Sequence, residues 1–261
     1  MPTIEDTGPN DRRRIVVLAA VVGAVALGGL AVLAFSGGDD DEERVAAEAP
    51  ATTVDDAAAA ATTATTADAP ADPADPGCPP ADASGPPVLQ FAEAPPVCID
   101  ETATYEARFV TTEGDIVIEL DPALDPVSVN NFVFLARNNY YDGTTFHRVI
   151  DGFVIQGGDP NGDPPGTGGP GYDFTGGFGP ETGYELGALA MANRGDPSSN
   201  GAQFFIITGP QGQALPPLYS PMGIVTEGLD IATAIQSVPT GDRDQPVDDV
   251  VVTDLVITEL G

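Results

Sequence analysis

The chain contains no lysine and no tryptophan, and only one histidine and two cysteines among its 261 residues. In a P-loop, lysine reaches the nucleotide phosphates, so the glycine-rich run GGDPNGDPPGTGGPG does not predict a nucleotide site. A metal centre needs more imidazole and thiol ligands than this chain has, and no GxSxG elbow indicates a serine nucleophile. We therefore expect neither a metal nor a cofactor.

Positive charge is also scarce. Nine basic residues stand against forty acidic ones, which gives a net charge of −31. Proteins that bind nucleic acid cluster lysine and arginine to neutralise phosphates, so we expect no nucleic-acid partner. An acidic surface keeps a protein soluble and self-repelling, and it indicates no particular function.

One long apolar run lies near the start of the chain, where residues 15–35 carry no charge. A helix of this length can cross a bilayer. Arg12, Arg13 and Arg14 precede the run and GGDDDEE follows it, so the positive-inside rule places residues 1–14 in the cytoplasm and the later residues outside. We expect a retained single-pass anchor in the cell membrane. The alternative is a cleaved signal peptide, whose apolar region is usually shorter.

Residues 36–77 consist largely of Ala, Thr, Asp and Pro, which cannot bury enough apolar surface to offset the entropy of ordering. We expect a disordered acidic linker there. The Pro-rich segment 78–103 follows, and it holds Cys78 and Cys98. In an oxidising exterior these two residues should form a disulfide, which would contribute about 3 kcal/mol by closing a loop of about 20 residues.

From residue 104 to 261 the composition is that of a folded domain with many short strands and two helices. Asp125 and Pro126 suit the start of the first helix, which should end near Asn138. Residues 157–187 form a long Gly/Pro-rich irregular region of the kind that is often functional. The pattern favours a closed β-barrel or a sandwich with helical caps. The other elements are expected as a strand hairpin within 105–120, strands within 144–150, 152–159, 188–193 and 202–208, a helix within 228–238 and a strand pair within 248–260.

Several polar residues interrupt these apolar strands. Arg148, Gln156, Asn193 and Gln203 have phenylalanine, leucine and methionine around them in the sequence. We expect Phe146 and Phe204 to be core residues. A buried arginine or glutamine needs partners, however, and a groove with an apolar floor and a few directed donors would provide them.

The runs FHRVIDGFVIQGGDP, GTGGPGY and LAMANRGDPSSNGAQFFI resemble the cyclophilins, the cyclosporin-binding family of peptidyl-prolyl cis-trans isomerases. The resemblance extends from about residue 104 to 261. It implies a mainly β fold, a closed eight-stranded antiparallel β-barrel capped by two α-helices, with a proline-binding groove on its outer face. By motif position Arg148 matches the catalytic arginine, and His147 matches a supporting histidine beside it. The substrate-binding positions of the family fall on Phe153, Val154, Gln156, Ala192, Asn193, Gln203, Phe205, Leu215 and Tyr219.

One wall of this groove departs from the family. Ala214 stands where cyclophilins often carry tryptophan, and Tyr219 stands where they often carry histidine. Arg194 replaces a residue that is usually small, which would narrow the neighbouring pocket or add charge to it. The resemblance therefore predicts peptide turnover more firmly than it predicts cyclosporin binding.

Together these features predict a membrane-tethered, extracytoplasmic and monomeric prolyl isomerase that acts on X–Pro bonds of unfolded or exported polypeptides. A cyclophilin-like module that holds proline-containing segments with little turnover is the alternative. A third hypothesis is an acidic adhesion protein, which would use the Arg-Gly-Asp triplet at residues 194–196.

Overall fold

The computed structural model describes residues 77–260, and the description below concerns that part of the chain. The expected anchor at residues 15–35 and all but the last residue of the expected linker lie outside it. Within the described residues, no helix is both long enough and apolar enough to cross a membrane.

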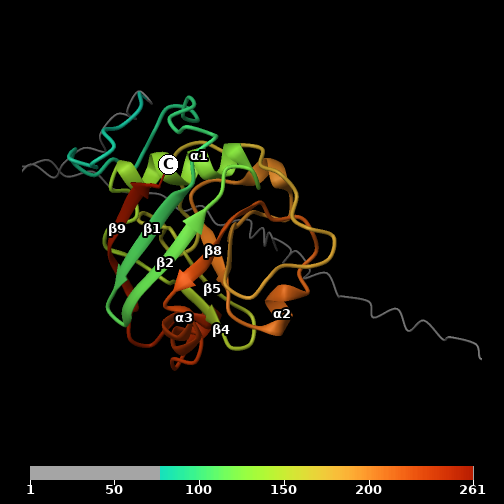
Figure 1. Cartoon of the computed structure of the whole chain (residues 1–261). Helices are drawn as coiled ribbons and strands as arrows, with labels where there is room; N and C mark the ends of the chain where they lie inside the picture. The colour runs from blue at the N-terminus through green and yellow to red at the C-terminus, as the bar shows by residue number, and fades with distance from the viewer. Residues whose placement is uncertain (1–76, 261) are drawn as a thin grey trace, which may run out of the picture. The chain divides into compact units, whose positions relative to one another are not determined.

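The described strands form one antiparallel sheet of nine strands, in the order β3-β9-β1-β2-β8-β6-β7-β5-β4 (Figure 1). This confirms the expected mainly β, antiparallel architecture. The strands are β1 (Tyr105–Thr111), β2 (Gly114–Leu120), β3 (Thr144–Thr145), β4 (Arg148–Ile150), β5 (Val154–Gly157), β6 (Ala188–Met191), β7 (Phe204–Ile207), β8 (Pro221–Glu227) and β9 (Val251–Glu259).

The expectation of a closed eight-stranded barrel is corrected. The sheet curls, but no ladder among the described strands joins its two edges, β3 and β4. These two strands follow each other in the chain and are separated only by residues 146–147, whose side chains are buried. A stretch expected as one strand therefore supplies both edges of the sheet.

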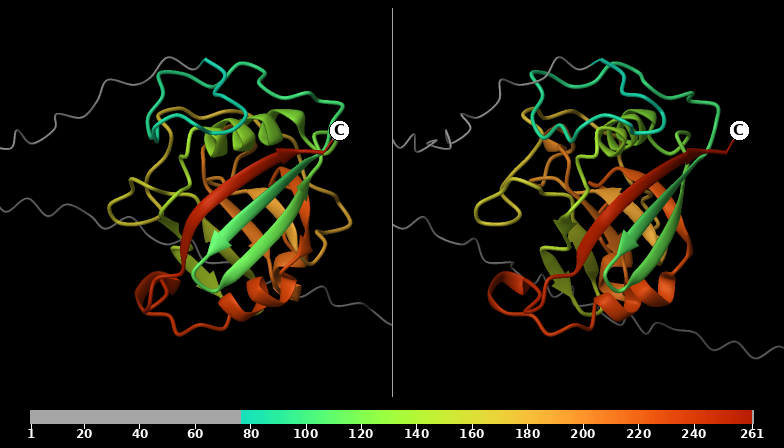
Figure 2. Two further views of the ribbon diagram at one scale, coloured as in Figure 1. Left: turned by 60° about the vertical axis from the view of Figure 1, so that its left-hand side comes forward. Right: turned by 90° about the vertical axis from the view of Figure 1, so that its left-hand side faces the viewer.

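Three α-helices and two 3₁₀-helices accompany the sheet in the described residues, where two helices were expected. Helix α1 covers one end of the curled sheet and α3 lies at the other end (Figures 1 and 2). The two additional 3₁₀ segments and α2 are single turns within loops. The helices are α1 (Pro126–Arg137), α2 (Pro210–Gln213), α3 (Leu229–Ile235), η1 (Pro197–Ser199) and η2 (Asp242–Asp244).

Helix α1 begins where the sequence predicts. Asp125 is its N-cap residue, Pro126 is its first residue, and the cap at the other end is Asn138. The Asp125 carboxylate does not accept a capping bond from the helix backbone. Its Oδ2 instead accepts hydrogen bonds from Ser128 Oγ at 2.6 Å and from Gly177 N at 2.7 Å, so it ties the irregular region to the helix start.

Two features near the C-terminus differ from expectation. A strand pair was expected within residues 248–260. The structure has one strand there, β9, which pairs with both β1 and β3. Strand β8 was not predicted, because Pro221 and Gly223 are residues that strands usually exclude. Gly223 is suited to this position because a Cβ there would lie 2.1 Å from the carbonyl oxygen of Glu119 on the paired strand.

Side chains alternate between the two faces of the sheet, because successive residues of a strand point in opposite directions. The main core lies on the inner face, where Phe204, Ile206, Ile155 and Leu189 are buried, and Phe146 joins them as expected. A second, smaller apolar cluster lies on the outer face of the same strands. It is the cluster that positions the candidate site.

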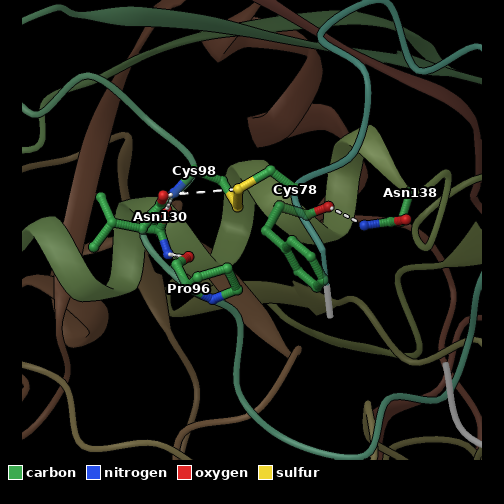
Figure 3. The surroundings of a disulfide bond; sticks show 7 residues. Cys78, Pro96, Cys98, Asn130 and Asn138 are labelled. Atoms are coloured by element: carbon green, nitrogen blue, oxygen red, sulfur yellow. Dashed lines mark hydrogen bonds between the residues drawn. A yellow bond between two sulfur atoms is a disulfide. The ribbon is translucent and has the colours of Figure 1, made fainter. Parts of the chain in front are cut away.

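The Pro-rich segment 78–103 packs along α1 (Figures 1 and 2). Cys78 and Cys98 form a disulfide with a Cα–Cα distance of 5.4 Å, as the sequence predicts. Figure 3 shows Asn130 of α1 beside it, with its amide donating to Pro96 O at 2.9 Å and accepting from Cys98 N at 2.7 Å. Phe91 carries the segment into the main core, where it is 3% exposed.

Candidate active site

The register of four neighbouring strands brings the predicted site residues into one row. Arg148 of β4 is paired with Gln156 of β5, Gln156 is paired with Phe205 of β7, and Phe205 is paired with Ala190 of β6. Paired residues project from the same face of a sheet. The row therefore lies on the outer face, with the inner face left to the main core.

An apolar floor lies along this row. Phe205 is 4% exposed and its ring meets Tyr219 edge-on, with centroids 5.3 Å apart. Phe153 and Leu215 pack against the same outer cluster. A hollow of about 130 Å³ opens above the floor, large enough for a proline ring. It is lined by nine residues that the sequence predicts for the site, namely Arg148, Phe153, Val154, Gln156, Ala192, Asn193, Phe205, Leu215 and Tyr219.

Arg148 contributes the positive charge of this hollow. Its Nη1 donates to Gln156 Oε1 at 3.2 Å, and its Cζ lies 5.8 Å from the centre of the Phe153 ring. Its Nε lies 3.6 Å from Asp244 Oδ2 of η2. The side chain is 37% exposed, so the guanidinium is held from two sides while it stays accessible to a ligand.

Gln203 is the one predicted substrate-binding residue that does not line this hollow. It lines a neighbouring one of about 420 Å³, together with Gln156, Ala192 and Asn193, so the two hollows share one wall. Gln156 Nε2 donates to Gln203 Oε1 at 3.0 Å. Gln203 Nε2 donates in turn to Gly166 O at 3.0 Å and lies 3.2 Å from Gly168 O.

Ala192 and Asn193 form the wall between the two hollows. Ala192 N donates to Gln203 O at 2.8 Å, which continues the β6–β7 pairing beyond the named strands. Asn193 Nδ2 donates to Leu218 O at 2.8 Å, and its Oδ1 accepts from Gly195 N at 3.0 Å. The Asn193 side chain is thus occupied in shaping the loop.

His147 lies outside both hollows. It is 6% exposed, and neither ring nitrogen has a hydrogen-bond partner within the described residues. Burial lowers its pKa below the ordinary value, so the ring is neutral near pH 7. Its ring packs under Gly166, where a Cβ would lie 3.1 Å from the imidazole. This geometry suits a supporting role beneath the loop and no role in proton transfer.

The Arg-Gly-Asp triplet is bound up in local contacts. Arg194 Nη2 pairs with Asp173 Oδ2 at 2.5 Å, and Arg194 lines the second hollow as the sequence analysis expected. The Asp196 carboxylate caps η1 by accepting from Ser198 N at 2.8 Å. Both charged groups therefore have partners within the described residues, while all three residues of the triplet are exposed; the adhesion hypothesis stays a prediction.

Sequence reasoning missed three contributors to the site. Asp159 accepts four backbone N–H groups of the loop that follows it, from Asn161, Gly162, Gly166 and Gly168. Asp244 pairs with Arg148 although 96 positions separate them, and nothing in the sequence distinguishes it from its acidic neighbours. The third contribution comes from the carbonyl groups of Gly166 and Gly168, which accept hydrogen bonds from Gln203. The only sequence signal for this loop was the long Gly/Pro-rich run, of a kind that is often functional.

Leu215 and Tyr219, which follow α2 in the chain, contribute one wall of the hollow. Ala214 caps the end of α2 and is exposed, and it does not line the hollow. Tyr219 does line the hollow, and its backbone is held by the Tyr184 hydroxyl, which accepts from Tyr219 N at 3.1 Å and donates to Tyr219 O at 2.7 Å. Within residues 77–260 no cluster of three potential metal ligands occurs.

Comparison with known proteins agrees with this geometry. The sequence pattern of the family described as "Cyclophilin type peptidyl-prolyl cis-trans isomerase/CLD" matches residues 107–257. The chain is 43% identical over 170 residues to a peptidyl-prolyl cis-trans isomerase B of Streptomyces anulatus, which covers 58% of this chain and 95% of that protein. It is 39% identical over 189 residues to peptidyl-prolyl cis-trans isomerase A of Mycobacterium tuberculosis, which covers 64% of this chain and 100% of that protein. Among solved structures, a cyclophilin type isomerase of Cryptosporidium parvum is similar, with a TM-score of 0.55, 33% identity, and 60% of this chain and 99% of that chain covered.

Proposed function

The chain belongs to the cyclophilin-type peptidyl-prolyl cis-trans isomerase family, and we propose that Arg148 drives its reaction by stabilising the transition state without a covalent step. Members of this family are enzymes that interconvert cis and trans X–Pro bonds, and this chain is such an isomerase. The observation that carries the proposal is the accessible guanidinium of Arg148, which faces a hollow floored by Phe205.

The barrier to be lowered is that of rotation about a partial double bond, about 18–20 kcal/mol. Uncatalysed exchange takes roughly 10–100 s. A turnover of about 10³ s⁻¹ requires four to five powers of ten, or roughly 5–7 kcal/mol. No bond needs to form for this, because twisting the amide removes its resonance and returns a lone pair to the prolyl nitrogen.

A guanidinium directed at that nitrogen binds the twisted state more strongly than either planar state, and such differential binding is what accelerates a reaction. Arginine suits the task because its charge is permanent and its donors are rigidly arranged. Phe153, Phe205 and Leu215 would hold the proline ring by apolar contact while the preceding carbonyl turns. Gln156 and Gln203 would fix the guanidinium and the substrate backbone beside it.

We further propose that the isomerase domain lies outside the cytoplasm, acts as a monomer on unfolded or exported polypeptides, and is tethered by residues 15–35. Two features support this. The uncharged run follows three arginines and precedes an acidic stretch, and the domain carries a disulfide between Cys78 and Cys98, which persists in oxidising compartments. Protease treatment of intact cells and of permeabilised cells tests the topology, because an outward-facing domain is digested in both.

Exchange NMR with an Ala-Pro peptide and the full chain in mild detergent tests the mechanism. We expect Arg148→Ala to lower the exchange rate about a hundredfold or more, as the loss of one transition-state donor does. Arg108→Ala is the matched control, because Arg108 is also a strand arginine with two surface pairs, to Glu106 and Asp115. Full catalysis by a folded Arg148→Ala protein would overturn the mechanism.

A proline-peptide binding module with little turnover is the second candidate. It is favoured by the ion pair between Arg148 and Asp244, which engages the guanidinium when no peptide is bound. The same NMR measurement separates the two candidates, because a binding module would shift the peptide signals without producing faster exchange.

A further inference from the structure

The Pro-rich segment, residues 78–103, precedes the stretch that matches the family pattern, yet it contacts the loop that lines the second hollow of the site. We call this the glycine-rich loop and define it as residues 159–173. The contact lies around Gln90 and Phe91. It joins a part of the chain outside the family match to the residues that hold Arg148.

The contact between segment and loop consists of three hydrogen bonds. Gln90 Nε2 donates to Gly169 O at 2.7 Å, and Phe91 N donates to Pro170 O at 2.8 Å. From the loop side, Asn161 Nδ2 donates to the carbonyl oxygen of Leu89 at 3.3 Å. The segment therefore holds the glycine-rich loop along one edge, through one backbone hydrogen bond and two from side chains.

Apolar packing supports the same contact. The Phe91 ring lies 4.8 Å from that of Phe134 and 6.4 Å from that of Tyr172, measured between centroids. Gly171 approaches the segment so closely that a Cβ would lie 2.5 Å from Phe91 O, and its φ is +98°, which favours glycine. The loop can approach the segment's backbone this closely because residue 171 has no side chain.

The opposite edge of the glycine-rich loop faces the site. Gly168, next to the Gly169 that Gln90 holds, carries one of the two carbonyls that lie within 3.2 Å of Gln203 Nε2. Gln203 is bonded to Gln156, and Gln156 is bonded to Arg148. Hydrogen bonds thus connect Gln90 to Gly169 O, and Gly168 O to the guanidinium through Gln203 and Gln156; the two parts are joined covalently, because the peptide groups that carry these carbonyls are adjacent.

The segment is itself firmly attached to α1, so it can restrain the loop. The disulfide joins Cys78 and Cys98 within the segment, and Asn130 of α1 bonds to Pro96 and Cys98 beside it (Figure 3). Val88 N donates to Asn138 O at 3.0 Å, and Asn139 Nδ2 donates to Ala83 O at 3.1 Å and to Gly85 O at 2.8 Å. These last bonds stabilise the segment without touching the glycine-rich loop, which makes Asn139 a useful control.

We infer that Gln90 is a positioning residue of the isomerase, which acts through the glycine-rich loop and Gln203 to hold Arg148 in its working orientation. The inference rests on the function proposed above. Gln90 touches no reacting atom, so its loss should lower kcat more than it changes KM. The loss expected is that of one hydrogen bond, about two- to tenfold.

The test measures kcat and KM by NMR line shapes on an Ala-Pro peptide, with the full chain at a temperature where every variant is folded. Gln90→Ala removes the side chain, and Gln90→Glu keeps its shape but cannot donate to Gly169 O. Asn139→Gly removes the two bonds at the other part of the segment, and glycine tolerates the φ of +53° found there.

We expect both Gln90 variants to lower kcat about two- to tenfold, with KM changed less than twofold, and to shift the side-chain amide signals of Gln203 and Gln156. Asn139→Gly should leave kcat and these signals unchanged. The inference is overturned if Gln90→Ala keeps the wild-type kcat, or if Asn139→Gly lowers kcat equally, which would indicate general loosening of the segment.

Failure of the proposed function would look different. In that case the wild-type chain would not accelerate cis-trans exchange of the peptide, and the exchange rate with Arg148→Ala would be the same as with the wild type. The amide signals would still report whether Gln90 reaches Gln203, because they are observed without turnover. An active wild type with unshifted amide signals in Gln90→Ala would count against the inference alone.

Discussion

Arg148 and Gln156 face each other on paired strands, and the arginine Nη1 lies 3.2 Å from the glutamine Oε1. The glutamine amide donates in the other direction, to Gln203. Gln156 therefore orients the guanidinium and is itself oriented by a second residue. An arginine with free rotamers would lose side-chain entropy on each encounter with a peptide, and this arrangement has already restricted it.

Replacing Gln156 tests that restriction. Gln156→Ala removes both hydrogen bonds but leaves the charge of Arg148 in place. We expect kcat/KM to fall about tenfold, because two bonds of ordinary strength are lost from a partly buried network. A protease-coupled or NMR exchange assay measures the change. An unaltered kcat/KM in a folded variant would mean that Arg148 needs no support from this side.

Asp159 should control the order of the glycine-rich loop. Its two carboxylate oxygens accept four backbone N–H groups, at 2.7 to 3.2 Å. Asp159→Asn places an NH₂ group against some of these donors, so we expect the free energy of unfolding to fall by about 2–3 kcal/mol. Urea denaturation measures this loss, and amide exchange should be faster for residues 161–169. Unchanged exchange in the loop would contradict the prediction.

The disulfide should stabilise the folded chain through the loop of about 20 residues that it closes. The double variant Cys78→Ser, Cys98→Ser is expected to lose about 3 kcal/mol of unfolding free energy. Urea titrations with and without reductant measure this. Reductant should destabilise the wild type to the level of the variant and leave the variant unchanged, so an equal response of both proteins would exclude the disulfide as the cause.

Stability should also depend on pH through His147. Burial lowers its pKa in the folded chain, whereas the unfolded chain keeps the ordinary value of about 6.5. Between these two values the unfolded state binds a proton that the folded state does not, so unfolding becomes easier as the pH falls below about 6.5. We therefore expect the free energy of unfolding to decrease between pH 6.5 and 5.5.

The check is simple because the chain has one histidine. Its ring protons give a single titration curve by NMR, and the midpoint should lie below 6.5 in the folded protein. His147→Gln should remove most of the change in unfolding free energy over this range. A midpoint at or above 6.5 would contradict the assignment of a buried neutral ring.

Much of this protein could be deduced from its residues. The start of α1 at Pro126 follows from the apolar spacing and from Asp125 at the N-cap position. The disulfide followed because the chain has only two cysteines, Cys78 and Cys98. Alternating apolar residues indicated β1 and β2. Arg148 and Gln203 stood out because polar groups in apolar strands need partners. That reasoning used the strands along the sequence and required no knowledge of how they pair in space.

The tertiary structure decided what local patterns cannot encode. Strand β8 pairs with β2, where Gly223 fits closely against Glu119, a contact between residues about 100 positions apart. Three other features likewise depend on contacts between segments that are distant in the sequence. They are the division of residues 144–150 into two sheet edges, the ion pair of Arg148 with Asp244, and the contact of Gln90 with Gly169. Local sequence sets the period and the caps of each element. The strand register and the loop contacts are set by burial and hydrogen bonding between distant segments, and these appear only once the chain has folded.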